Sequence, residues 1–284
     1  MSPHPDRVVI ISDFSQAKGG ASKLAVLLAG LLADTGQPVT LFAGDHRGET
    51  VDNIDTVNLG SDALLAANPL RSAMSGVWNR QAKQRLSDWI VGNDTPNTIY
   101  HVHGFMQTLS PSIFAALHGV RHRTVIHAHD YFLACPNGAF FDYQKAQTCP
   151  QIPLSMGCVT CHCDKRNYPQ KLWRVARQTT LNAKLAAFRT DATFILLHDR
   201  MAEYLHRAAT PTHSPTVANP AQAFLPEPIT AAQNHLFCYV GDLHDYKGVS
   251  LFAEPTILHS TQISDPCRGR GSDPKGKHER QTRE

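Results

Sequence analysis

The stretch RVVIISDFSQAKGGASKLAVLLAGLLADTGQPVTLFAG, residues 7–44, decides the fold. It opens with an apolar run rich in β-branched residues, which indicates a buried strand over residues 7–14. Leucines then recur with helical spacing, and a second short strand is expected over residues 38–44. The residues that define and end the helix are Leu24, Leu27, Leu28, Leu31, Leu32, Gly36 and Pro38. A strand, a helix and a strand in this order predict a β-α-β unit with parallel strands.

The same alternation continues along the chain. Further strands are expected over residues 54–59, 97–104, 123–129 and 192–197. Helices are expected over residues 69–91, 110–119, 170–188 and 199–208. The pattern predicts an α/β domain over residues 6–210, built on a Rossmann-like, doubly wound parallel sheet.

The composition changes after this domain. Residues 211–234 are rich in Pro, Thr, Ala and Asn, which is typical of an interdomain linker. Residues 235–254 again read as a strand, a glycine turn and a helix start, so only the start of a second Rossmann-like domain is expected. Residues 255–284 lack periodicity and suit a disordered or aberrant tail. A complete second domain would need on the order of 150 more residues, so we expect a truncation.

Composition and charge narrow the class of protein. With 42% hydrophobic residues the chain can bury a core, and a formal charge of +3 gives no support for nucleic-acid binding. The N-terminus has no signal-peptide pattern, and no apolar run is long enough to span a bilayer. A soluble cytoplasmic protein is expected, in which cysteines stay reduced or bind metal.

Two glycines lie between the first expected strand and the first helix. Gly19 and Gly20 would let a phosphate or sugar approach the backbone, and a helix N-terminus favours an anion. The sequence is neither a Walker loop nor GxGxxG, so a tight strand-to-helix turn explains the glycines equally well.

Two histidine pairs lie at the ends of expected strands. His101 and His103 should point to one side of their strand, and so should His127 and His129, because strand side chains alternate between faces. Ligands of open α/β sheets bind beyond the carboxyl ends of the strands. We therefore expect His103 and His129 in a site and His101 and His127 in structural hydrogen bonds. Asp130 would orient His129 or cap a turn.

Five motifs in order resemble a known enzyme family. They are GGASK (19–23), HVHG (101–104), HAHDYFLACPNG (127–138), Asn219-Pro220 and YVGDLHDYKG (239–248). Together they resemble the retaining glycosyltransferases of family 4, which have the GT-B fold, over residues 7–254. The insert at 133–166 resembles a bacterial subgroup of cell-surface polysaccharide or lipid-linked glycan assembly.

The resemblance implies a reaction and a set of roles. Such enzymes transfer a sugar from a nucleotide-sugar donor to a glycan or lipid-linked acceptor, and the transfer requires no metal cofactor. The N-terminal domain mainly binds acceptor and the C-terminal domain donor. His129 would be catalytic, and the substrate-binding residues would be Gly19, Gly20, His103, Asp130 and, against the donor diphosphate, Lys247.

Two other functions remain open. Asp242 stands where the family usually has an arginine, and no E-x7-E segment follows Glu254. These departures favour a truncated, non-catalytic remnant that binds glycan or a partner. A zinc-dependent hydrolase built on the histidine pairs has less support, because the sequence has no H-E-x-x-H.

Residues 135–163 hold five of the chain's seven cysteines. Four of them, Cys149, Cys158, Cys161 and Cys163, predict a structural zinc site that ties down a loop. A reduced, partly buried cysteine cluster is equally consistent with the spacing.

The stretch after the cysteines combines cations with apolar residues. This pattern suits peripheral contact with the inner face of a membrane, although a solvated helix face explains it better. The residues are Lys165, Arg166, Lys171, Arg174 and Arg177, beside Leu172, Trp173 and Val175.

Overall fold

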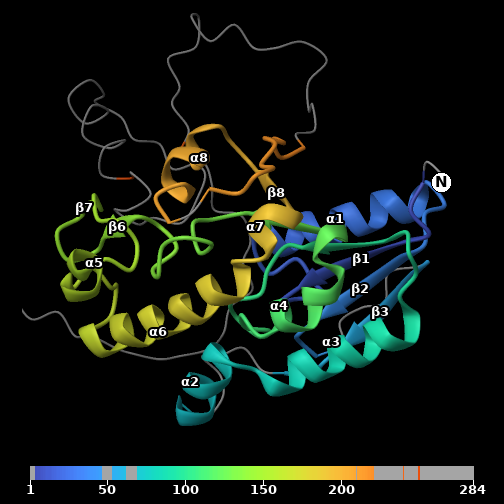
Figure 1. Ribbon diagram of the computed structural model, residues 1–284, viewed down its shortest axis with the longest axis horizontal. Helices are drawn as coiled ribbons and strands as arrows, with labels where there is room; N and C mark the ends of the chain where they lie inside the picture. Colours follow the sequence, from blue (N-terminus) through green and yellow to red (C-terminus); the bar gives the residue numbers. More distant parts are fainter. Residues whose placement is uncertain are drawn as a thin grey trace, which may run out of the picture. The chain divides into compact units, whose positions relative to one another are not determined.

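The computed structural model describes residues 4–46, 53–61, 69–208 and 210–220, together with Tyr239 and Val249. The four ranges belong to one compact unit, Met1–Pro228. Its centre is a six-stranded, entirely parallel sheet (Figure 1). The strands are β1 (Arg7–Ser12), β2 (Val39–Ala43), β3 (Ile54–Asn58), β4 (Thr98–Val102), β5 (Thr124–Ala128) and β8 (Thr193–Leu196).

The strand order is β3-β2-β1-β4-β5-β8. In chain order this is 3-2-1-4-5-6, the order of the Rossmann fold. The predicted fold class is confirmed for this unit.

Helices cover both faces of the sheet, because apolar strand residues point to each of the two faces. Val8 and Ile10 pack with Ala25 and Ala29 of α1 on one face. Val9, on the other side of β1, joins the larger core on the opposite face. The helices are α1 (Gly20–Asp34), α2 (Pro69–Val77), α3 (Arg80–Asn93), α4 (Ile113–Ala116), the 3₁₀ helix η1 (Leu117–Arg123), α6 (Tyr168–Leu185), α7 (Phe188–Asp191) and α8 (Arg200–Leu205).

The single helix expected over residues 69–91 is two helices. Asn79 has extended backbone angles, and its side chain accepts a hydrogen bond from the Ala82 N–H as the N-cap of α3. The same side chain donates to the Thr108 carbonyl, and the Asn79 N–H donates to Ser110 Oγ. These bonds to a distant loop interrupt a helical pattern that periodicity alone would continue.

The insert at 133–166 leaves the sheet after β5 and returns to it through α6. Its regular elements are short: β6 (Phe141–Asp142), β7 (Gln147–Thr148) and α5 (Met156–Thr160). The expectations for Asp242, Lys247 and the tail 255–284 lie outside the described residues.

Candidate functional site

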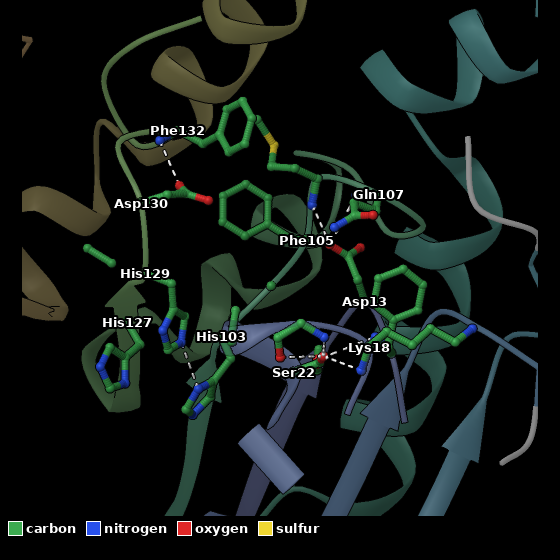
Figure 2. Close-up of a pocket in the computed structure, with 18 of the residues that line it drawn as sticks. Asp13, Lys18, Ser22, His103, Phe105, Gln107, His127, His129, Asp130 and Phe132 are labelled. Carbon is green, nitrogen blue, oxygen red and sulfur yellow. Dashed lines mark hydrogen bonds between the residues drawn. The ribbon is translucent and has the colours of Figure 1, made fainter. Parts of the chain in front are cut away.

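A pocket of about 380 Å³ lies at the carboxyl ends of β1, β4 and β5 (Figure 2). Strand order reverses between β1 and β4, because β1 continues to β2 on one side while β4 lies on the other. Open α/β sheets bind ligands at this switch point. The residues that line the pocket come from 12–14, 18–22, 103–107 and 127–133.

Asp13, directly after β1, holds the loop that follows β4. Its carboxylate accepts hydrogen bonds from the backbone N–H groups of residues 106–109, at 2.8 to 3.1 Å. It also accepts one from the Thr108 hydroxyl at 3.0 Å. Because Asp13 is buried, these donors replace the water that an ionised carboxylate would otherwise require. The carboxylate therefore fixes one wall of the pocket.

The glycine loop forms another wall. Ser22 Oγ accepts hydrogen bonds from the N–H groups of Lys18 and Gly19, both at 3.0 Å. These bonds fix the loop at the N-terminus of α1. A side chain added at Gly19 or Gly20 would meet nothing within 4 Å, and neither residue has a positive φ. Neither backbone conformation nor packing within the chain requires these glycines. They leave open space beside the pocket.

Four imidazoles meet at the ends of β4 and β5. Ring centroids are 4.2 Å apart for His101 and His103, and 4.3 Å apart for His127 and His129. The two strands are neighbours in the sheet, so the pairs also contact each other. Nδ1 of His103 and Nε2 of His129 lie 3.0 Å apart in a hydrogen bond, which Figure 2 shows.

The histidine group is uncharged at neutral pH. Burial lowers the pKa of His101 to about 3 and of His127 and His129 to about 4. The pKa of His103 is also lowered, first by burial and then by the neighbouring imidazoles. Uncharged imidazoles can each donate one hydrogen bond and accept another, as sugar hydroxyls also do.

His101 and His127 differ from the expectation of structural hydrogen bonds. Nε2 of His101 and both ring nitrogens of His127 are buried without a hydrogen-bond partner, and so is Nε2 of His103. Ligand atoms of these three residues all lie within 4.8 Å of one another, the one such group of His, Cys, Asp and Glu side chains in the described part of the chain. Orphaned imidazole nitrogens at this spacing could hold a metal ion.

Asp130 is one of the residues that line the pocket. Its carboxylate accepts a hydrogen bond from the Phe132 N–H at 2.8 Å. As a whole residue Asp130 is exposed, but the protein packed around its carboxyl group raises the pKa to about 6. The Asp130 carboxyl can therefore change its protonation near neutral pH.

Arg177 of α6 contacts two residues that line the pocket, Met106 and Phe132. Its guanidinium is buried, lies 5.3 Å from the centre of the Phe132 ring, and donates to the Met106 carbonyl at 3.2 Å. Burial lowers its pKa to about 10, which the nearby Asp13 and Asp130 oppose. The arginine thus connects the loops that carry Asp13's partners and Asp130.

The cysteines of the insert separate into two environments. Four of them, Cys135, Cys149, Cys158 and Cys163, line one small cavity with Lys171. Cys161, in contrast, donates its thiol hydrogen to the Asp142 carboxylate, with Sγ and oxygen 3.7 Å apart.

The basic stretch before and within α6 does not form a cationic surface. Lys171 and Arg177 are buried, and Arg174 forms an ion pair of 2.8 Å with the buried Asp164. Two of the five cations expected to face a membrane or solvent are therefore buried, and the half-buried Arg174 is paired with a carboxylate. No helix in the described ranges is long and apolar enough to cross a bilayer.

Two supporting residues were not anticipated from sequence. Asp13 could have been found, because an acidic residue directly after a buried strand lies at the ligand-binding edge of the sheet. Arg177 gave no local signal, because its burial depends on how α6 packs against loops distant in sequence.

Two plant proteins are among the solved structures that match part of this chain. One is a complex between a UDP-glucosyltransferase from Polygonum tinctorium, capable of glucosylating indoxyl, and 3,4-dichloroaniline; the TM-score is 0.41, with 12% identity over 82% of this chain and 57% of that chain. The other is Phytolacca americana UGT2 complexed with UDP-2fluoro-glucose and pterostilbene, with a TM-score of 0.36 and 12% identity over 72% of this chain and 50% of that one. The chain thus spans about half the length of these two. No protein-family model matches the sequence, and no curated protein is significantly similar to it.

Proposed function

We propose that this chain is the acceptor-side part of a glycosyltransferase, which takes part in retaining transfer of a sugar from a nucleotide-sugar donor to a glycan or lipid-linked acceptor. The observation that carries the proposal is the convergence of His103, His127, His129, Asp130 and the glycine loop on one pocket at the switch point. The five ordered motifs supply the reaction class.

The residues have distinct roles in this proposal. His129 contacts the transferred sugar. His103 orients the His129 ring through the hydrogen bond between the two imidazoles. Asp130 accepts a hydrogen bond from a substrate hydroxyl when ionised. The open space at Gly19 and Gly20 admits the donor phosphates, and Lys247 would stabilise the leaving diphosphate.

A turnover assay with the 284-residue chain tests the proposal. Release of nucleoside diphosphate from a panel of nucleotide sugars is measured with and without glycan acceptors. Turnover that His129→Ala abolishes and that exposed His118→Gln retains supports an enzyme. Saturable glycan binding without turnover supports the alternative of a non-catalytic remnant. Absence of both binding and turnover contradicts the two functions together.

A metal-dependent reaction is a second candidate, favoured by the orphaned nitrogens of His101, His103 and His127. Three imidazoles that leave a coordination position open are a typical catalytic zinc arrangement. Metal titration of the chain against a His101→Gln/His127→Gln variant tests this candidate. Equal binding by both proteins contradicts it.

A further inference from the structure

The insert contains a second, much smaller cavity. It has a volume of about 10 Å³, close to the smallest that holds one water molecule. Four cysteine side chains line it, and each is no more than 7% exposed. They come from separate points of the insert and form no disulfide: Cys135, Cys149, Cys158 and Cys163.

Lys171 of α6 reaches the same cavity. Its ammonium donates to Sγ of Cys163 at 3.2 Å and to Sγ of Cys158 at 3.5 Å, and the residue is only 1% exposed. A buried ammonium is costly unless a negative charge lies beside it.

Protonated thiols would leave this charge unbalanced. One lysine can offset one thiolate, yet four cysteines surround the cavity. A divalent cation deprotonates the thiols that coordinate it. The buried ammonium would then offset one of the two negative charges of the zinc–tetrathiolate complex.

We propose that Cys135, Cys149, Cys158 and Cys163 bind one zinc ion in a closed tetrahedral site that fixes the insert 133–166. In this structure the four sulfur atoms do not form as compact a group as the ligand atoms of His101, His103 and His127. Binding draws them together to about 2.3 Å from the ion and releases the thiol protons. The insert has only short regular elements, so a metal crosslink supplies the order that an extended hydrogen-bonded framework would otherwise give. This inference does not depend on the proposed transfer reaction.

Lys171 and Asn137 complete the site as donors to its sulfur atoms. Asn137 Nδ2 donates to Sγ of Cys163 at 3.2 Å and to the Cys163 carbonyl at 2.7 Å. Hydrogen bonds to coordinating sulfur orient the ligands and stabilise their charge. Both residues are therefore positioning residues for the metal.

Cys161 provides a matched control. The zinc ligands predicted from cysteine spacing include Cys161, whereas the ligands proposed from the structure include Cys135 in its place. Protein purified without added metal is analysed for zinc and iron. We expect about one zinc per chain, most of it lost in Cys135→Ser and Cys163→Ser and retained in Cys161→Ser. Zinc retained in Cys135→Ser but lost in Cys161→Ser overturns this ligand set.

Three other results also overturn the proposal. The first is a chain that contains no metal and whose thiols all react with a thiol reagent. The second is iron bound in place of zinc. The third is zinc that is lost only in the His101→Gln/His127→Gln variant.

Cobalt substitution of the unmutated protein keeps the proposal testable if a serine variant does not fold. Tetrahedral coordination by sulfur gives an intense visible spectrum with thiolate charge-transfer bands, whereas imidazole ligands give no such bands. Lys171→Met should weaken zinc binding about 10- to 100-fold in a chelator competition. Unchanged affinity would overturn the role of Lys171, and a cobalt spectrum without thiolate bands would overturn the site.

Discussion

At the scale of single residues, the pocket combines uncharged imidazoles with one carboxylate that is fully engaged. Sequence placed His103 and His129 at strand exits, and the structure brings them into a hydrogen bond. The sequence could not show that ring nitrogens of His101 and His127 lack hydrogen-bond partners, because such partners come from neighbouring strands and loops. These environments lead to two predictions.

Acid should destabilise the fold through the histidine group. The pKa of His127 falls from 6.5 to about 4 on folding and that of His101 to about 3, so the unfolded chain binds more protons between these values. The free energy of unfolding therefore decreases as the pH falls below about 6.5. For buried His127 the loss is on the order of 3 kcal/mol by pH 4. Denaturant unfolding across this range, with a chelator present, measures it.

Protonation of Asp130 has the opposite effect on the free energy of unfolding. Its pKa is raised to about 6, so its protonation as the pH falls favours the folded state. His127→Gln should reduce the pH dependence, and exposed His118→Gln should leave it unchanged. Stability that does not vary between about pH 6.5 and pH 4 would contradict uncharged, buried imidazoles.

Asp13→Asn should weaken the whole unit. An amide cannot accept the four N–H bonds and the hydroxyl bond that the Asp13 carboxylate accepts, and its NH₂ group would face donors. We expect the free energy of unfolding to fall by about 3 kcal/mol. Asp88→Asn, on the exposed face of α3, should change it by less than about 0.5 kcal/mol. Similar losses in both variants would contradict the role of Asp13.

At the scale of elements, the sequence pattern predicted the type and place of the six strands of the parallel sheet, because short apolar runs indicate buried strands. It did not predict β6 and β7 of the insert. It failed at Asn79, where bonds to residues 108–112 end one helix and begin another. It also failed for α6, whose cations at Lys171 and Arg177 face the interior. In both cases contacts between elements overrode the local pattern.

Alanine at the glycines of the loop should separate stability from binding. A Cβ at Gly19 or Gly20 would meet no atom within 4 Å, so neither Gly19→Ala nor Gly20→Ala should introduce a clash. Gly30→Ala, also unobstructed within α1, should stabilise it by about 0.5 to 1 kcal/mol and serves as the control. We expect weaker ligand binding in the first two variants alone, measured by calorimetry. Equal binding by all three proteins would show that the open space is not used.

At the scale of the whole molecule, the described unit carries the pocket at the carboxyl ends of β1, β4 and β5. A glycan that binds its pocket should stabilise the chain by RT ln(1 + [L]/Kd), about 2.7 kcal/mol at a concentration of 100 Kd. Thermal unfolding with and without glycan measures the effect, and His103→Ala/His129→Ala should remove it. If glycan still stabilises this double variant, glycan binds at another site on the chain.

The sequence by itself determined the alternation of strands and helices, the parallel sheet and the strand exits where the histidine pairs lie. These properties depend on local periodicity, which records the buried face of each segment. Only the tertiary structure decided that β4 and β5 are neighbours, so that four imidazoles meet, and that Asp13 holds the loop after β4. It also grouped Cys135, rather than Cys161, with the other cysteines around Lys171. Distances between segments far apart in sequence are set by sheet order and side-chain packing, which local spacing does not encode.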